Sequence, residues 1–470
     1  PTTEELLKQI QALQATVQSL QKQVQSHDES IAKTKEAIPE GAEVATSADI
    51  DGLKSALEDY KYTVARDREY STALSTRGLT IGGTLTGSYV HSSQPTAATS
   101  NRPYGAASEQ SFTASATLSF SGNLYRDYND GKNLDYKFGL AYSNPKFANG
   151  ASSTNSPAPG DSVTKVTDLY LQYSLFKTNG GLEDPKLTVT FGQQKIPFGL
   201  EAQVSDELKP TVSTAQFLGT SALSQLGKRQ IGVVLRGDLE PTVDYGFNYR
   251  APLVEYALGV INGNGDNTAD DNTRKDWIAR AAFVLPVDYN SAFRELKFGT
   301  SYYAGWKVLN STGTGTPVLA DAAHTTRRGV DISYNHNPYG LTYERADGVD
   351  DALKVPASLT NAATNKIKSS GQVLTAFYNF GDIAQWSKNL NRVGKYDDYW
   401  PTTSQVYFRH DRWDPNISAT NDEIFKNTVG YNYFFAQTTK LQIGLTRTSY
   451  PSGAHKASAN DLTALFQYGF

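Results

Sequence analysis

The sequence contains no cysteine, and this absence excludes several kinds of chemistry. Without thiols there is no disulfide framework, no cysteine-ligated zinc site and no cysteine nucleophile. A chain without cysteine suits an oxidising compartment such as the periplasm, although many cytosolic proteins also lack it. Methionine is absent too, and nothing in the sequence explains that absence.

Long apolar runs are also missing. No stretch approaches the roughly 18 consecutive apolar residues that a membrane-spanning helix needs, and the mean hydropathy is −0.47. A transmembrane β-barrel remains compatible with this value, because only every second strand residue faces lipid. The content of 28 Tyr and 20 Phe, against 5 Trp, favours β-structure.

The net charge of −4 gives no indication of nucleic-acid binding. Motifs of serine hydrolases, zinc peptidases and P-loop proteins are absent, so we expect no enzyme, no cofactor and no metal site. His410 lies beside Asp411, but neighbouring strand residues point to opposite faces and would not form a catalytic pair. An outer-membrane hydrolase stays open as an alternative. A calcium site at Asp266, Asp270, Asp271 and Asn272 is an alternative to a solvated loop there.

The first 38 residues predict a helical coiled-coil stalk. Apolar residues recur in alternating steps of four and three, which is a heptad pattern. A helix with such a stripe needs a partner, and branched residues with Leu in the seam favour two strands. His27 interrupts the seam, either as the solvated end of the coil or as a pH-sensitive position. The seam residues are Leu6, Ile10, Leu13, Val17, Leu20, Val24 and Ile31.

Residues 39–76 are expected to form a linker with a second helical segment. Pro39 and Gly41 end the first helix. A shorter heptad-like run follows, and Thr46 and Asp49 precede it with the spacing of a capping box. This run contains Ile50, Leu53, Leu57, Tyr60 and Val64.

From Arg77 onwards the period of the apolar pattern changes to two. Segments of about ten residues alternate oily and polar side chains, which is long enough for a tilted strand to cross a bilayer. Counting them gives about 16, an even number as single-chain bacterial barrels require. The count assigns residues 243–249 to a turn. We therefore predict an all-β fold over residues 77–470, a 16-stranded antiparallel transmembrane β-barrel with an N-terminal coiled coil.

The connections between these segments alternate in length, as long outer loops and short inner turns do in such barrels. With the stalk in the periplasm, the long connections 91–110, 143–163, 199–228 and 310–325 fall outside. The short connections 127–132 and 336–338 fall inside. Residues 382–402 make an inner connection that is too long for this scheme, and a plug, a partner contact or an error of register would each account for it.

The last strand alternates up to an aromatic final residue, through Leu462, Ala464, Phe466, Tyr468 and Phe470. A terminal Phe with an aromatic two residues earlier resembles the signal that outer-membrane assembly machinery recognises. The chain starts at Pro1 without a charged and then apolar leader, so we expect any signal peptide to have been removed. Lipid-facing girdle aromatics are expected at Tyr89, Phe112, Tyr302, Trp306, Tyr433 and Tyr468.

Three stretches resemble the family of phosphate- and polyphosphate-selective porins and its coiled-coil-bearing dicarboxylate-channel relatives. They are FGQQKIPFGL at 191–200, KRQIGVVLRG at 228–237 and EYALGVINGNGDN at 255–267. The resemblance implies a 16-stranded trimeric barrel whose third outer loop folds into the lumen. It also implies an arginine-lined constriction and a lysine ladder, whereas the polar faces of the first two strands here are Thr, Ser and Gly. The implied trimer competes with the two-stranded preference of the heptads, and we favour the trimer.

The candidate constriction consists of basic residues in or beside the third loop and on inward strand faces: Lys195, Lys209, Lys228, Arg229, Arg280 and Lys297. Asp135, Lys137 and Lys307 are also expected to face the lumen. The alternative is that these charges brace the barrel wall as ion pairs. Fixed positive charges in a narrow pore favour anions, so the sequence predicts passive diffusion of small hydrophilic, anionic solutes across the outer membrane.

Two other readings stay open. The protein could be a structural anchor whose stalk binds peptidoglycan or another envelope layer, or a soluble or surface-layer β-protein. The expected partners are two further copies of the chain, through barrel walls and stalks, and outer-membrane lipid.

Overall fold

In the computed structural model the chain divides into two compact units, Pro1–Thr76 and Arg77–Phe470. The structure describes residues 3–36, 51–61 and 79–470. The gaps in the last range are 94–108, 127–131, 144–162, 179–180, 206–207, 220–222, 224–225, 246–248, 311–316, 337, 354–363, 382–402, 436–437 and 455–457. The long connection 382–402 therefore lies outside the described residues.

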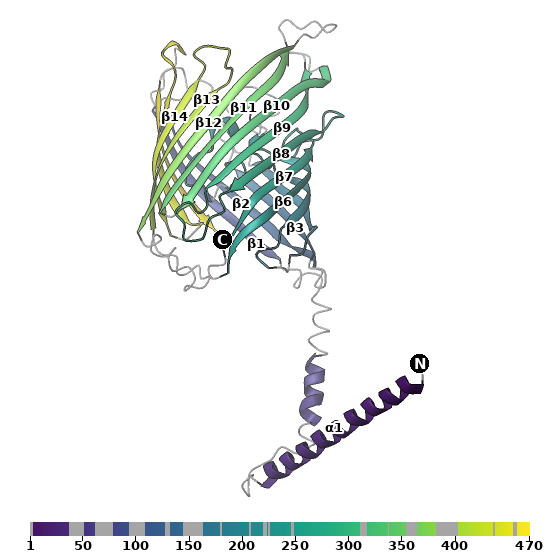
Figure 1. Ribbon diagram of the computed structural model, residues 1–470. Coiled ribbons are helices and arrows are strands. Elements are labelled where there is room, and N and C mark those ends of the chain that lie inside the picture. The colour runs from purple at the N-terminus through teal and green to yellow at the C-terminus, as the bar shows by residue number, and fades with distance from the viewer. Residues whose placement is uncertain are drawn as a thin grey trace. The chain divides into compact units, whose positions relative to one another are not determined.

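The second unit is a closed antiparallel barrel of sixteen strands, in which each strand pairs with its neighbours in sequence and β1 pairs with β16 (Figure 1). The predicted strand count is confirmed. Of the residues assigned to a turn, Val243 and Asp244 belong to β6 and Tyr249 begins β7, while 246–248 lie outside the described residues. The strands are β1 (Thr80–Ser92), β2 (Glu109–Arg126), β3 (Asn133–Ser143), β4 (Val163–Ser174), β5 (Leu187–Lys195), β6 (Arg229–Asp244), β7 (Tyr249–Ile261), β8 (Asp276–Val284), β9 (Lys297–Asn310), β10 (Pro317–His336), β11 (Tyr339–Leu353), β12 (Thr364–Gly381), β13 (Thr403–Asp414), β14 (Ile424–Phe434), β15 (Lys440–Ser449) and β16 (Ala459–Gly469).

The two-residue period divides the strands into an apolar outer face and a polar inner face. Outward side chains such as Phe112, Phe191 and Leu445 are 82%, 61% and 61% exposed. The inward side chains of Asn432 and Gln442 are 0% and 2% exposed, because Lys209 and Pro210 lie against them inside the barrel. This is the reverse of a water-soluble sandwich, whose apolar side chains face inward.

The final residue closes the barrel. The backbone N–H of Gly83 donates to the carbonyl of Phe470 at 3.0 Å, and the N–H of Phe470 donates to the carbonyl of Gly83 at 3.1 Å. A Cβ atom at Gly83 would lie 2.4 Å from the backbone carbonyl oxygen of Thr117 and 2.8 Å from the Phe470 ring, so glycine is needed here. The end of the barrel where β1 starts and β16 finishes is here called the closing end, and the opposite end is the far end.

The first unit contains α1 (Thr3–Glu36) and a second helical segment at 51–61. Both predicted helices are present, whereas their pairing with other copies stays a prediction. The stripe residues Val17, Leu20 and Val24 are 49%, 54% and 58% exposed. Pro39, Gly41 and the predicted capping box at Thr46 and Asp49 lie outside the described residues.

Within the described residues, none of the helices is both long enough and apolar enough to span a membrane.

Candidate pore and its constriction

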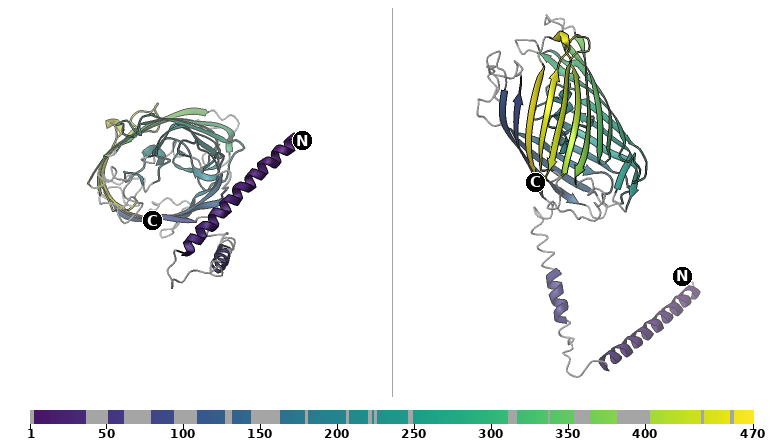
Figure 2. Two further views of the ribbon diagram at one scale, coloured as in Figure 1. Left: turned by 60° about the horizontal axis from the view of Figure 1, so that its bottom comes forward. Right: turned by 90° about the vertical axis from the view of Figure 1, so that its left-hand side faces the viewer.

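The connection from β5 to β6, residues 196–228, leaves the barrel wall and contacts strands on the other side. In the closed ring of sixteen strands, β13 is eight steps from β5 in either direction. The connection nevertheless hydrogen-bonds to β9, β11, β13, β14 and β15. It therefore crosses the interior, and Figure 2 (left) shows teal ribbon within the ring of strands.

The first half of the connection is held by two carboxylates and an arginine. Glu344 of β11 is 2% exposed and accepts the backbone N–H groups of Leu200 and Glu201 at 3.0 and 2.9 Å. The Glu201 carboxylate in turn lies 2.9 Å from the guanidinium of Arg409 in β13. Arg409 also donates to the hydroxyl of Thr211 at 3.1 Å, so it ties two parts of the connection to one strand.

The middle of the connection, from Lys209 to Gln216, is fixed mainly through its backbone. The N–H of Gln216, in the short helix α3 (Gln216–Gly219), donates to Asp411 at 2.8 Å. Asn432 donates its side-chain amide to the Pro210 carbonyl at 2.6 Å. Lys440 donates to the Lys209 carbonyl at 2.6 Å. These contacts depend little on the side chains of the connection, so the sequence of the loop alone gives no sign of them.

Apolar side chains of the connection pack on an apolar area of the inner wall. Phe198, Phe217 and Leu223 are fully buried, in one cluster with Tyr303 and Trp413 of β9 and β13. This cluster is unusual for a water-filled lumen, and it anchors the connection by the hydrophobic effect.

Two inward glycines make room for this packing. A Cβ atom at Gly329 of β10 would lie 2.8 Å from the Phe198 ring, and one at Gly371 of β12 would lie 2.4 Å from Phe217. Glycine inside a strand commonly marks a close approach by another segment. These glycines were the signal in the sequence that could have predicted where the loop docks.

Three of the six candidate constriction residues form ion pairs with lumenal acids. Arg229 lies 2.7 Å from Asp168 of β4, and Arg280 lies 2.5 Å from Asp331 of β10. Lys297 lies 2.7 Å from Glu255 of β7. Each of these three basic groups therefore has an acidic partner, as expected if the charges brace the barrel wall as ion pairs.

The other three candidates lie in or beside the connection. Lys195 donates to the carbonyl of Val204 at 2.9 Å. The Lys209 side chain is buried, and that of Lys228 is exposed. Lys195 and Arg229 are opposite each other in the β5–β6 ladder at the far end, whereas Lys297 begins β9 at the closing end. The six residues therefore do not form one ring.

Two acids of the inner wall are each shared by two basic groups. Asp168 contacts Arg229 and, at 3.5 Å, Lys137. Asp350 contacts Arg327 at 2.9 Å and Lys307 at 3.0 Å. The side chains of Lys137 and Lys307 are each 36% exposed. Each triad of one acid and two basic groups has a net charge of one positive unit, and the lysine of each triad is open to solvent.

The balance is reversed at Arg409, which contacts both Glu201 and Asp411. Here the acidic side chains are 13% and 3% exposed, so the excess negative charge is largely covered. Arg327 and Arg409, which are 2% and 3% exposed, were missed by the sequence analysis. Their inward positions follow from strand parity, but their partners depend on which strands are neighbours.

The residues of the two alternative sites make other contacts. His410 contacts Asn427 at 2.8 Å, while Asp411 accepts from the loop inside the barrel, so the two point to opposite faces as predicted. In the suggested calcium loop, Asp266 pairs with Lys165 and Asp270 with Lys275. No group of three His, Asp or Glu side chains that could hold a metal ion occurs within the described residues.

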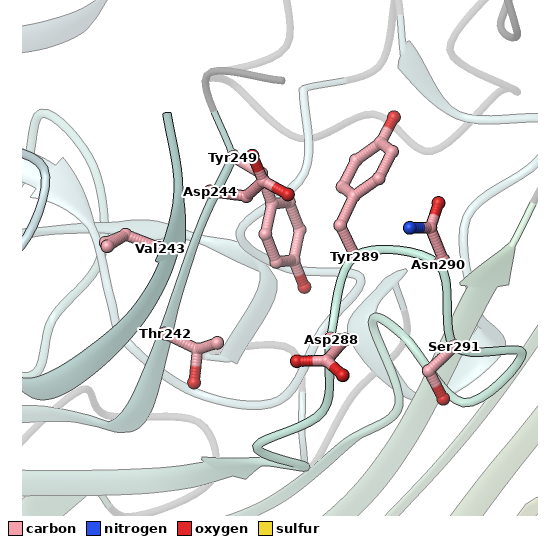
Figure 3. A pocket seen from close by; sticks show the side chains of 8 residues that line it. All are labelled: Thr242, Val243, Asp244, Tyr249, Asp288, Tyr289, Asn290 and Ser291. Carbon is pink, nitrogen blue, oxygen red and sulfur yellow. The ribbon is translucent and has the colours of Figure 1, made fainter. Parts of the chain in front are cut away.

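A separate cavity of about 420 Å³ lies at the closing end, between the β6–β7 turn and the connection 285–296 (Figure 3). Thr242, Asp244 and Tyr249 line one side, and Asp288 and Tyr289 line the other. It is apart from the β5–β6 connection and has no evident part in the pore.

No protein-family model and no curated protein matches the sequence. Solved structures similar to this chain include an anion-selective porin from Comamonas acidovorans, with 12% identity, coverage of 84% of this chain and 99% of that chain, and a TM-score of 0.49. A loop-deletion mutant of OmpT, an outer membrane protein of Vibrio cholerae, has 12% identity, the same two coverages and a TM-score of 0.48. Pseudomonas putida OprB has 11% identity, coverage of 85% and 96%, and a TM-score of 0.47.

Proposed function

We propose that this protein is an outer-membrane porin, through which small hydrophilic solutes, preferentially anions, diffuse passively. The observation that carries the proposal is the closed barrel with an apolar outer face whose interior is crossed by the β5–β6 connection. An apolar outer face suits lipid, and the closed ladder leaves no strand edge unpaired in it. The crossing connection narrows the lumen and selects solutes by size.

We propose the preference for anions because the lysines of the Asp168 and Asp350 triads are open to solvent. In a narrow, low-dielectric pore, a few fixed charges determine which ions enter. Lys137 and Lys307 are the accessible charges, whereas the acids they contact are nearly covered, at 11% and 8% side-chain exposure. Arg229 and Arg280 stay in the proposal as charges close to the path, each partly offset by its acid.

Single-channel conductance in planar bilayers, with reversal potentials across a salt gradient, tests the proposal. We expect steps in groups of three and a reversal potential on the anion side. Lys137→Gln with Lys307→Gln is expected to reduce the anion preference more than Arg229→Ala or Arg280→Ala does. Arg447→Gln, which removes an outward charge on β15, is the matched control. A cation-side reversal potential in the wild type would refute the anion preference.

A second function, a structural envelope anchor, is favoured by one observation, the uncovered apolar stripe of α1. Deletion of residues 1–76 distinguishes the porin function from the anchor function. A deletion protein that conducts normally but loses envelope attachment would support the anchor as an additional role, and absent conductance in the full chain would make it the main one.

A further inference from the structure

The outer face of the barrel carries its basic side chains unevenly. On β8 and β9 every charged side chain makes an inward contact: Asp276 with Tyr303, Arg280 with Asp331, Lys297 with Glu255 and Lys307 with Asp350. On β10, β11 and β12 the outward positions include exposed Arg328, Arg345, Lys366 and Lys368. These four residues are here called the outer basic patch.

Their outward direction follows from their neighbours. Arg327 and Glu344, which precede Arg328 and Arg345, are each 2% exposed and face the interior. Ser369, which follows Lys368, is 1% exposed. Because successive strand residues point to opposite faces, the basic residues face out of the barrel.

The register brings the patch residues together. Arg328 is opposite Asp347, which is opposite Ser370, and Lys368 is opposite Val349. Adjacent strands lie about 4.8 Å apart, and positions two residues apart on one strand lie about 6.6 Å apart. The ends of the long side chains can therefore converge on one group of phosphate size.

The acids near the patch are already engaged. Asp347 accepts from Arg345 at 3.0 Å and from Ser370 at 2.6 Å. Asp351 accepts the backbone N–H of His324 at 2.9 Å. For the part of the chain that the structure describes, no ion pair involves Arg328, Lys366 or Lys368. The patch thus keeps an excess of positive charge that calls for an anion from outside the chain.

Apolar side chains lie on the same strands towards the closing end. Val330, Ile332 and Leu341 are 51%, 39% and 45% exposed. Measured along the barrel axis from the start of β11, Arg345 lies roughly 15 Å higher and Lys368 roughly 25 Å higher. Both heights fall in the upper part of an apolar band about 25 Å tall. Long basic side chains at that height reach towards the headgroups while their stems cover apolar surface.

We propose that the outer basic patch binds the phosphate groups of an acylated anionic lipid in the leaflet at the far end of the barrel. The acyl chains would cover Val330, Ile332 and Leu341, and the phosphates would contact Arg328 and Lys368. The inference rests on the proposed membrane-spanning function. A phosphorylated lipid A type of glycolipid has the required chemistry.

Binding of fluorescent diphosphorylated lipid A to the full-length protein in detergent tests the proposal, with dephosphorylated lipid A as the second probe. The double variant Arg328→Gln/Lys368→Gln is expected to weaken binding of the diphosphorylated lipid at least about tenfold, because it removes two charge-assisted hydrogen bonds. Arg447→Gln removes an outward, exposed charge on β15 and is expected to change affinity less than twofold.

Equal affinity for the two lipids, or an unchanged affinity in the double variant, would overturn the proposal. An altered oligomer mass in the double variant with unaltered lipid affinity would assign the patch to contact between barrels instead. Conductance of the same variant is measured in parallel. Because the patch faces away from the lumen, a conducting variant that has lost lipid binding supports this inference, and a non-conducting wild type refutes the proposed function separately.

Discussion

The carboxylate of Glu201 lies 2.9 Å from the guanidinium of Arg409, although 208 residues separate them in the chain. The pair joins the β5–β6 connection to a strand on the opposite side of the barrel, and the Arg409 side chain is only 3% exposed. A buried arginine that loses one of its partners is costly, since the charge remains without compensation. The position of the connection across the lumen therefore depends on this contact.

Removing Arg409 is expected to widen the pore. In Arg409→Met, Glu201 and Thr211 lose their partner and the first half of the connection is released, so single-channel conductance should rise. The measurement is conductance together with the size of the largest polyethylene glycol that enters the lumen. Arg412→Met is the control, because Arg412 lies outside on the same strand and pairs with Glu423. Unchanged conductance in Arg409→Met would show that the remaining contacts, from Glu344, Asp411, Asn432 and Lys440 and from the apolar cluster, hold the connection without Arg409.

Filling the space of an inward glycine is expected to displace the connection. Gly371→Leu would place side-chain atoms where Phe217 packs, since even a Cβ atom would lie 2.4 Å from it. Overpacking of this kind costs about 1–3 kcal/mol. The temperature at which the folded barrel changes its mobility on a denaturing gel should fall. Gly87→Leu is the control, because a Cβ atom at Gly87 meets nothing within 4 Å.

Neutralising Asp168 is expected to increase the preference for anions. In Asp168→Asn the wall loses one negative charge while Arg229 and Lys137 both remain, so the local charge becomes more positive. The reversal potential in a salt gradient should move further to the anion side. Asp347→Asn, which changes an outward carboxylate, should leave the reversal potential unaltered. An unaltered reversal potential in Asp168→Asn would mean that Asp168, Lys137 and Arg229 do not face the conducting path.

Because the chain has no cysteine, a single introduced thiol can report on pairing of the stalk. A coil with Leu20 in its seam brings the copies of that residue from neighbouring chains together, so Leu20→Cys should form disulfide-linked pairs of chains on mild oxidation. Gln18→Cys, on the opposite face of α1, should cross-link much less. Equal cross-linking at both positions would argue against a specific heptad seam.

Much of the fold could be predicted from the sequence because a tilted strand in a membrane barrel must alternate. The alternation from Leu79 onwards predicted the strands, the closed barrel, and the inward direction of Arg280 and Lys307. The N-terminal heptads predicted a helix within the first 38 residues, where α1 spans Thr3–Glu36, and its pairing as a coiled coil stays a prediction. Such patterns involve residues only a few positions apart, so each strand or helix can be predicted from its own segment of sequence.

The site was less predictable because its contacts join segments far apart in the chain. Arg280 was expected to line the constriction, but only the pairing of β8 with β9 and of β9 with β10 brings Asp331 beside it. Arg409 was missed because its partner Glu201 belongs to a loop without periodicity.

The sequence by itself determined the alternation of strands and the apolar outer face, since both follow from local patterning and the need to satisfy every backbone group in lipid. Only the tertiary structure decided which charges are neutralised and which stay open, and where the β5–β6 connection docks. Those properties depend on strand register and on distances across the barrel, which no local pattern encodes.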